Sequence, residues 1–147
     1  IKGAIKNNDG FIDPEGIDEN EQVQHFLSWS QNNKVKFLAS ELRIYSVEHF
    51  LGGTVDFVCE IEGNVWIGDL KTSSNLYPEN LWQCGGYDIL LTEMGLYQPI
   101  KGYVLLNLRK DGSFLEKRSV LLEEHKKAFI SCLNIYRLKQ QIENQIL

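Results

Sequence analysis

The sequence predicts an α/β fold with a central mixed β-sheet flanked by α-helices. Two β-rich runs, 54–61 and 65–71, are separated by a short turn that contains Gly and Asn. A helical segment follows them, and two more β-rich runs, 100–108 and 114–120, come after it. The resulting order, α-β-β-β-α-β-β-α, is typical of an α/β domain, and we expect residues 1–147 to form a single one.

The N-terminal part begins with a segment rich in Gly, Asn and Asp, residues 1–17, which we expect to be a loop. Asp18 followed by Glu21 predicts the start of a helix, because a carboxylate at the N-cap and a glutamate three residues later cap the first turn. This helix should run to about Gln31. Its inward residues should be Val23, Phe26 and Leu27.

The remaining elements follow from hydrophobic patterning and turn residues. Strands are expected at 37–47, 54–61 and 65–71. Pro78 should open a helix that ends at about Met94, since proline is tolerated in a first turn. A second hairpin should join 100–108 to 114–120 through Lys110-Asp111-Gly112-Ser113. The last helix, about 122–144, should present Phe129, Leu133 and Tyr136 on one stripe.

The hairpin between 54–61 and 65–71 carries the candidate site. With Gly63-Asn64 as the two-residue loop, Glu62 pairs with Val65, and Asp56 falls opposite Lys71 while Val58 falls opposite Asp69. Cross-strand partners share a face, and so do residues two apart on one strand. Asp56, Asp69 and Lys71 should therefore project from one side. The other side should carry Val55, Phe57, Cys59, Ile61, Trp66 and Leu70.

Two adjacent carboxylates repel each other, and a hard divalent cation removes that penalty. Mg²⁺ commonly takes one or two carboxylates and fills its other positions with water and phosphate oxygens. Lys71 could then hold a nucleophilic water or offset charge on the phosphate. Glu41 could supply a further ligand or a base. The simpler alternative is an ordinary cross-strand ion pair between Asp56 and Lys71 with Asp69 as a solvated neighbour.

Beyond this chemistry, the motifs Gly53-Thr54-Val55-Asp56, Asp69-Leu70-Lys71-Thr72 and Gln83-x-x-x-Tyr87, preceded by a strand glutamate, resemble the PD-(D/E)XK nuclease superfamily. The resemblance covers roughly residues 38–90. It is closest to the branch that contains the RecB and AddAB nuclease domains and phage recombination exonucleases. It implies a restriction-endonuclease-like core.

The resemblance also implies roles for individual residues. Asp56 and Asp69 would bind Mg²⁺ or Mn²⁺ with the Leu70 carbonyl, Lys71 would be the catalytic lysine, and Glu41 the first-motif acid. Gln83 and Tyr87, four apart on a helix, would share a face and organise the site and its DNA, with Thr72 beside them.

Two features of that family are missing from this sequence. Its metal-binding histidine would stand in a G-x-x-x-H context, which His25 lacks. Either the first-motif helix lies outside this chain, which we expect, or His25 is unrelated to that histidine. The late cysteine group that holds an iron–sulfur cluster in some relatives is also missing, and no cluster is expected.

Composition narrows the partners and the compartment. The three cysteines have no metal-ligand spacing, which favours reduced thiols and a cytoplasmic location. No run is apolar enough for a membrane span. Net charge is −5, but residues after Gly95 carry nine Lys/Arg against five Asp/Glu. Their basic side chains could contact DNA phosphates, with a solvated surface as the alternative for each. These are Lys101, Arg109, Lys110, Lys117, Arg118, Lys126 and Lys127.

Two classes of function remain open on this evidence. The first is a metal-dependent deoxyribonuclease, expected to be an exonuclease in DNA recombination or repair. The second is a non-cleaving nucleic-acid-binding or assembly module on the same fold. Retention of both aspartates and the lysine favours the first, and a restriction-type endonuclease subunit would need a sequence-reading element not found here. A homo-oligomer or a larger recombination complex is compatible with either.

Overall fold

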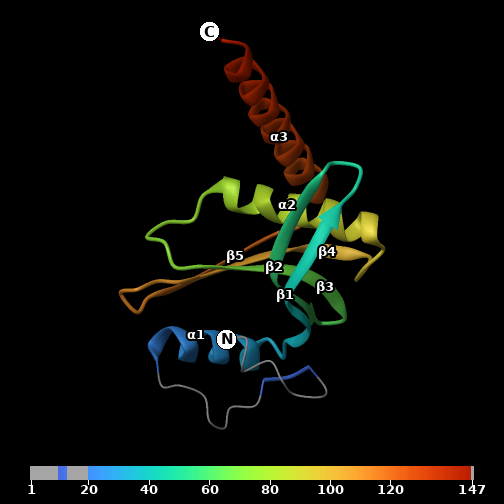
Figure 1. Cartoon of the computed structure of the whole chain (residues 1–147). Helices are drawn as coiled ribbons and strands as arrows, with labels where there is room; N and C mark the ends of the chain where they lie inside the picture. Colours follow the sequence, from blue (N-terminus) through green and yellow to red (C-terminus); the bar gives the residue numbers. More distant parts are fainter. Residues whose placement is uncertain (1–9, 13–19, 147) are drawn as a thin grey trace.

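The computed structural model describes residues 10–12 and 20–146 and has the α/β architecture that the sequence predicts. Its elements are α1 (Glu21–Asn32), β1 (Lys36–Ser46), β2 (Leu51–Ile61), β3 (Asn64–Lys71), α2 (Pro78–Met94), β4 (Ile100–Leu108), β5 (Phe114–Ser119) and α3 (Leu122–Gln145). The strands lie in one sheet in the order β1-β2-β3-β4-β5 (Figure 1). All pairs are antiparallel except β3–β4, so the sheet is mixed.

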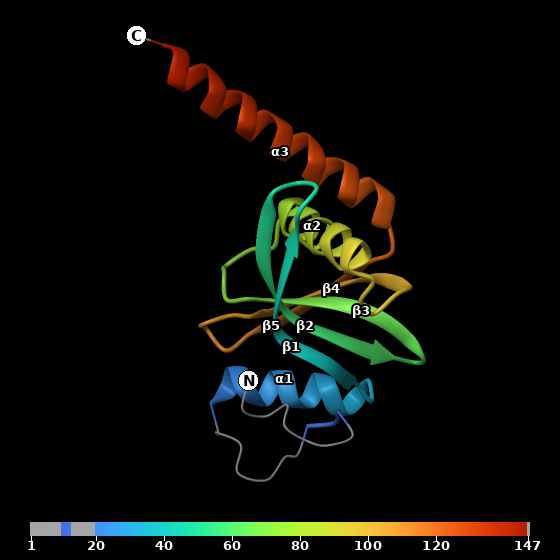
Figure 2. The ribbon, with the colours of Figure 1, turned by 45° about the vertical axis from the view of Figure 1, so that its right-hand side comes forward.

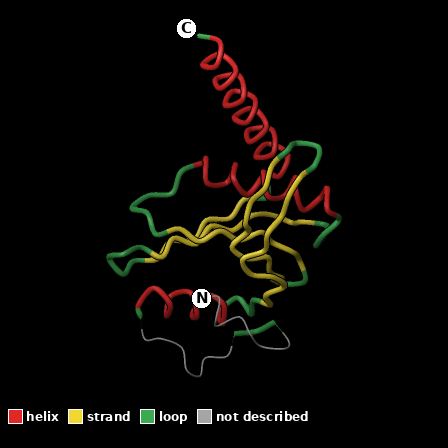
Figure 3. Tube along the Cα trace, in the orientation of Figure 1, coloured by secondary structure: helices red, strands yellow, loops and turns green. Residues whose placement is uncertain are grey.

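The helices flank the sheet on its two faces. Figure 3 shows α1 on one side of the strands and α2 on the other, with α3 beyond α2. Helix α2 connects the two parallel strands β3 and β4, as expected because parallel neighbours require a crossover connection. This five-stranded mixed sheet with its helices agrees with a restriction-endonuclease-like core.

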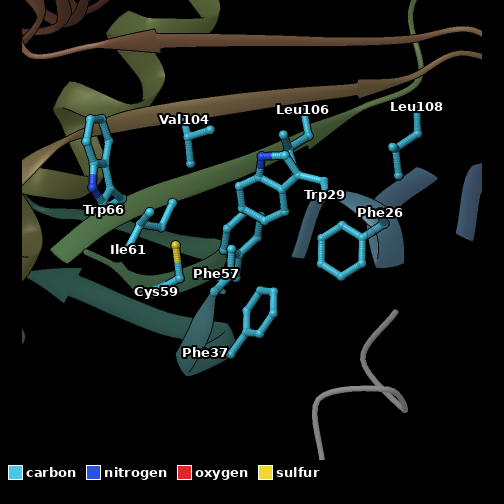
Figure 4. Close-up of a cluster of buried hydrophobic side chains, with 11 residues drawn as sticks. Phe26, Trp29, Phe37, Phe57, Cys59, Ile61, Trp66, Val104, Leu106 and Leu108 are labelled. Carbon is cyan, nitrogen blue, oxygen red and sulfur yellow. The ribbon is translucent and has the colours of Figure 1, made fainter. Parts of the chain in front are cut away.

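A hydrophobic core fills each face of the sheet. On the α1 side, Phe26 and Trp29 pack with Phe37 and Phe57 in a cluster of aromatic rings whose centroids lie 5.5–6.0 Å apart (Figure 4). On the α2 side, buried residues of the sheet meet Cys84, Leu90 and Leu91 of α2. Because both faces are covered, a polar side chain on either face must reach a hydrogen-bond partner or the sheet's margin.

Helix α1 begins later than the sequence predicts. Its N-cap is Asn20, whose side chain accepts a hydrogen bond from the N–H of Gln22 at 2.8 Å. The predicted cap at Asp18 is therefore wrong as a helix start, and Asp18 itself, like most of the predicted loop 1–17, lies outside the described residues. Phe26 and Leu27 are buried as expected, whereas Val23 is only half-buried.

Every buried or half-buried side chain of helix α3 lies in its first half, between Leu122 and Leu133. Figure 2 shows its C-terminal half extending past α2. The large apolar side chains of that half are correspondingly exposed, and they are Ile135, Tyr136, Leu138, Ile142 and Ile146. Of the predicted stripe, Phe129 and Leu133 are half-buried and Tyr136 is exposed. None of the described helices is both long and apolar enough to cross a membrane.

Candidate functional site

The hairpin that carries the candidate site has a different register from the predicted one. Ile61 pairs with Asn64, so the two loop residues are Glu62 and Gly63 instead of Gly63 and Asn64. Both have positive φ, 52° and 79°, as a type I′ turn requires. The whole pairing shifts by two residues: Val58 pairs with Ile67 instead of Asp69, and the paired residues end at Phe57 and Gly68, which are adjacent in the chain to Asp56 and Asp69.

A shift of two residues preserves the face of every side chain, because side chains alternate with a period of two. Asp69 therefore lies on the α2 side of the sheet with Ile67, which is two residues before it on β3. Val58 of β2, which pairs with Ile67, lies on the same side. Val55, however, is not on the face of Phe57. It packs in the α2-side cluster, because the β1–β2 ladder lacks a pair at Glu41 and Asp56 and strict alternation fails there.

Asp56, Asp69 and Lys71 form one contiguous group. The N–H of Leu70 donates to Asp56 Oδ2 at 2.7 Å, and Lys71 Nζ lies 2.9 Å from Asp69 Oδ2. Asp69 is only 3% exposed. Its Oδ2 is paired with the Lys71 ammonium, because a buried carboxylate without a partner would be costly for the folded protein.

Electrostatics at Asp69 reflect this crowding. Burial and, after it, interaction with the Asp56 carboxyl group raise the pKa of its carboxyl group to about 7, although Lys71 opposes both. Two carboxylates that cannot both ionise cheaply are typical of sites that bind a cation or share a proton.

Gln83 and Tyr87 of α2 extend the group, and they share a face of the helix as their spacing of four predicts. Lys71 Nζ donates to Gln83 Oε1 at 3.0 Å, and Gln83 Nε2 donates to the Tyr87 hydroxyl at 2.9 Å. Burial, and the nearby charges of Asp69 and Asp56, raise the pKa of Tyr87, so its phenol stays neutral at physiological pH. A continuous polar chain therefore runs from Asp69 through Lys71 and Gln83 to Tyr87.

Glu41 lies on the neighbouring strand β1. It is exposed, and the β1–β2 register places it across from Asp56. Its φ is 47°, an uncommon value for a residue other than glycine that concentrates at functional sites. Within residues 10–12 and 20–146, no three His, Cys, Asp or Glu side chains gather closely enough to hold a metal ion, so Glu41 does not complete a three-acid set with Asp56 and Asp69.

Asp56 and Asp69 are the two carboxylates of this group that could hold a cation. This set fits Mg²⁺ or Mn²⁺, which commonly bind through one or two carboxylates and retain several waters. Thr72 lies exposed directly after β3.

His25 lies elsewhere in the fold. Its Nε2 is 2.6 Å from the Gly112 carbonyl oxygen, and its ring stacks on Phe114 with centroids 5.6 Å apart. These contacts attach α1 to the β4–β5 turn and give His25 a structural role. The three cysteines are free thiols, and burial raises the pKa of the Cys59 thiol to about 12.

A second buried carboxylate was not anticipated from the sequence. Asp88 of α2 is 1% exposed and accepts a hydrogen bond from the Tyr103 hydroxyl at 2.6 Å. Lys126 of α3, one of the basic residues considered for DNA contact, lies 3.6 Å from the same oxygen. The carboxylate thus joins α2 to β4 and α3. In the sequence, the one sign of this contact is that Asp88 is an acidic residue among the apolar residues of α2.

Comparisons with known proteins identify no family. No family model and no curated protein matches the chain. Among solved structures, the chain is similar to the one titled "Crystal structure of SSO0001", with 12% sequence identity and a TM-score of 0.41. The match covers 76% of this chain and 57% of the chain in that structure.

Proposed function

We propose that the chain is a metal-dependent deoxyribonuclease that hydrolyses phosphodiester bonds at DNA ends in recombination or repair, and that its site is the group Asp56, Asp69 and Lys71. The observation that carries the proposal is the contact between Lys71 and Asp69 beside Asp56. An ion pair needs one acid, whereas here two acids and a lysine converge on the α2 side of the sheet.

In this proposal each side chain has a distinct task. Asp56 and Asp69, with the Leu70 carbonyl, hold Mg²⁺ or Mn²⁺. When bound, the cation supplies a water of lowered pKa and polarises the phosphate. The Lys71 ammonium offsets the negative charge that develops on the phosphate in the transition state. Gln83 keeps that ammonium in place by accepting one of its hydrogen bonds at 3.0 Å.

Calorimetric titration with Mn²⁺ and Mg²⁺ tests the metal site. The wild type should bind a cation, and Asp69→Ala should lose most of that binding. Glu143→Ala, which removes an exposed acid at the far end of α3, is the matched control and should bind like the wild type.

Cleavage of end-labelled DNA with and without the metal tests the reaction. Wild-type protein should shorten the DNA only when the cation is present. Metal binding with intact DNA would instead support a non-cleaving binding module. If the wild type and Asp69→Ala bind the cations equally and the DNA stays intact, the proposal that the chain is a nuclease is refuted.

A further inference from the structure

A cavity of about 430 Å³ opens beside the polar chain, between the β1–β2 hairpin, α2 and α3. Its volume lies within the range of small-molecule sites. None of the side chains that line it carries a formal charge. Among them are Gly53 of β2, Gln83 and Tyr87 of α2, and Phe129, Cys132 and Tyr136 of α3.

Glycines let the surrounding elements approach closely enough to form this cavity. A Cβ at Gly86 would lie 2.6 Å from the Phe129 ring, so the ring rests directly on the α2 backbone. A Cβ at Gly53 would lie 3.2 Å from the Tyr87 ring. The rings of Phe129 and Tyr87 are thereby held close to the backbone at Gly86 and Gly53 on two sides of the cavity.

The hairpin end of the cavity is fixed by polar contacts. Glu93 of α2 accepts hydrogen bonds from the Ser46 hydroxyl and from the N–H of Val47 at 3.1 Å. Arg137 of α3 donates to the carbonyl of His49. The tip of the hairpin is therefore attached to both helices, and the cavity is largely formed before any ligand arrives.

The cavity adjoins the candidate metal site through two shared residues. Gln83 and Tyr87 both line it, while Gln83 also accepts the hydrogen bond from Lys71. A ligand that spans both places would set an anionic group at Lys71 and the proposed cation, and an apolar or aromatic group among the uncharged side chains of the cavity. A nucleotide within a DNA strand meets this description.

We propose that the cavity receives one unstacked nucleobase of the DNA strand whose phosphate lies at Asp56, Asp69 and Lys71. This inference rests on the proposed function. A free phosphate would find no cation among the lining residues, whereas a base can stack on Tyr87, Phe129 or Tyr136. Such stacking tolerates any base, because every base has a π-face, so the cavity favours single-stranded ends without selecting a sequence.

Two oligonucleotides of equal length and charge test the inference. One is single-stranded oligothymidylate and the other carries abasic residues throughout. Dissociation constants are measured by fluorescence anisotropy with Ca²⁺ in place of Mg²⁺ to suppress cleavage. Stacking contributes about 1–3 kcal/mol per base, or about 5- to 150-fold in the dissociation constant. The wild type should therefore bind the base-bearing strand at least about fivefold more tightly.

Variants of cavity residues test whether the preference for the base-bearing strand arises in the cavity. Tyr136→Ala removes an aromatic wall, and Cys132→Trp fills the space; both positions are exposed on α3, so the fold should survive. Each should reduce the preference by at least about fivefold. Ile135→Ala, at a neighbouring 66% exposed side chain outside the cavity, should leave it unchanged.

Three results would overturn the inference. If Tyr136→Ala and Cys132→Trp keep the wild-type preference, the base binds elsewhere. Equal affinity of the wild type for both strands would leave the proposed function standing through phosphate contacts alone, with no base in the cavity. If the wild type binds neither strand, the proposed function fails together with the inference.

Discussion

The backbone N–H of Leu70 donates a hydrogen bond to Asp56 Oδ2 across 2.7 Å. This bond ties the carboxylate of β2 to β3 at the residue between Asp69 and Lys71. It explains why the acids stay together although the β2–β3 ladder ends at the Phe57–Gly68 pair. The bond also separates two roles of Asp56, since its charge and its hydrogen bond can be removed independently.

Asp56→Asn should keep the hydrogen bond to Leu70 through the amide oxygen but remove the charge. We expect Mg²⁺ affinity to fall at least about tenfold with little change in the free energy of unfolding. Asp56→Ala removes both, and should in addition lower the free energy of unfolding by about 1–3 kcal/mol, the usual cost of losing a hydrogen bond to a charged group. Calorimetry and urea unfolding of both variants measure the two effects, and equal stabilities would show that the bond contributes nothing.

The stability of the metal-free protein should fall as pH rises from about 4 to about 7. Burial raises the folded-state pKa of Asp69 to about 7, whereas the unfolded chain has the ordinary value near 3.8. Between these values the folded state binds more protons than the unfolded state, so the free energy of unfolding decreases with pH. The decrease is about 4 kcal/mol at most.

Urea unfolding in EDTA at pH 4.5 and pH 8, with Asp69→Asn as the comparison, measures this effect. The variant lacks the titrating group, so its stability should change less with pH than that of the wild type. Adding Mg²⁺ at pH 8 should raise the free energy of unfolding of the wild type but not that of Asp69→Asn. Identical pH dependence in the two proteins would contradict the raised pKa.

The sequence predicts the element order well because hydrophobic periodicity and turn residues report local structure. It also places Asp56, Asp69 and Lys71 on one face despite a wrong loop, because the error was two residues and the side-chain period is also two. Val55 was misplaced because the irregularity at Glu41 and Asp56 has no local signal. A prediction that assumes regular alternation of side chains along a strand cannot show where the pairing of two strands is interrupted.

Features that need tertiary packing were beyond the sequence. The spacing of Gln83 and Tyr87 indicates that they share a face of α2, but not that the face meets Lys71. The cavity depends on how α3 rests against α2 through Gly86 and Phe129, which are 43 residues apart in the chain. Such long-range contacts follow from close packing of the whole fold.

Gln83 should act on cleavage through Lys71. Gln83→Ala removes the acceptor at 3.0 Å from Lys71 Nζ, and we expect kcat to fall about 5- to 10-fold, in line with about 1 kcal/mol for a net hydrogen bond. Lys71→Met should lower kcat by about 10²–10³, as does loss of one stabilising donor in other enzymes. Both variants should still bind Mn²⁺.

A double-mutant cycle checks that the two residues form one unit. If Gln83 only positions Lys71, the double variant should be no slower than Lys71→Met, because residues in contact are not additive. Gln145→Ala at the end of α3 controls for the loss of an amide. Fully additive effects would show that Gln83 acts independently, for instance by contacting the DNA itself.

Gly68 should be the position in β3 least tolerant of a side chain. It pairs with Phe57, and a Cβ there would lie 2.0 Å from two atoms of the Phe57 ring. Since that ring is fully buried among other aromatic rings, it cannot move aside without disturbing the α1-side core. Gly68→Ala should lower the free energy of unfolding by about 1–3 kcal/mol or more, the usual cost of overpacking.

Gly52→Ala, whose Cβ would meet only the Ile44 carbonyl oxygen at 3.7 Å, is the control and should change stability by less than about 1 kcal/mol. Because Phe57 follows Asp56 and Gly68 precedes Asp69, the Gly68 variant should also weaken Mg²⁺ binding, and urea unfolding with calorimetry on the same samples would show whether the two losses occur together.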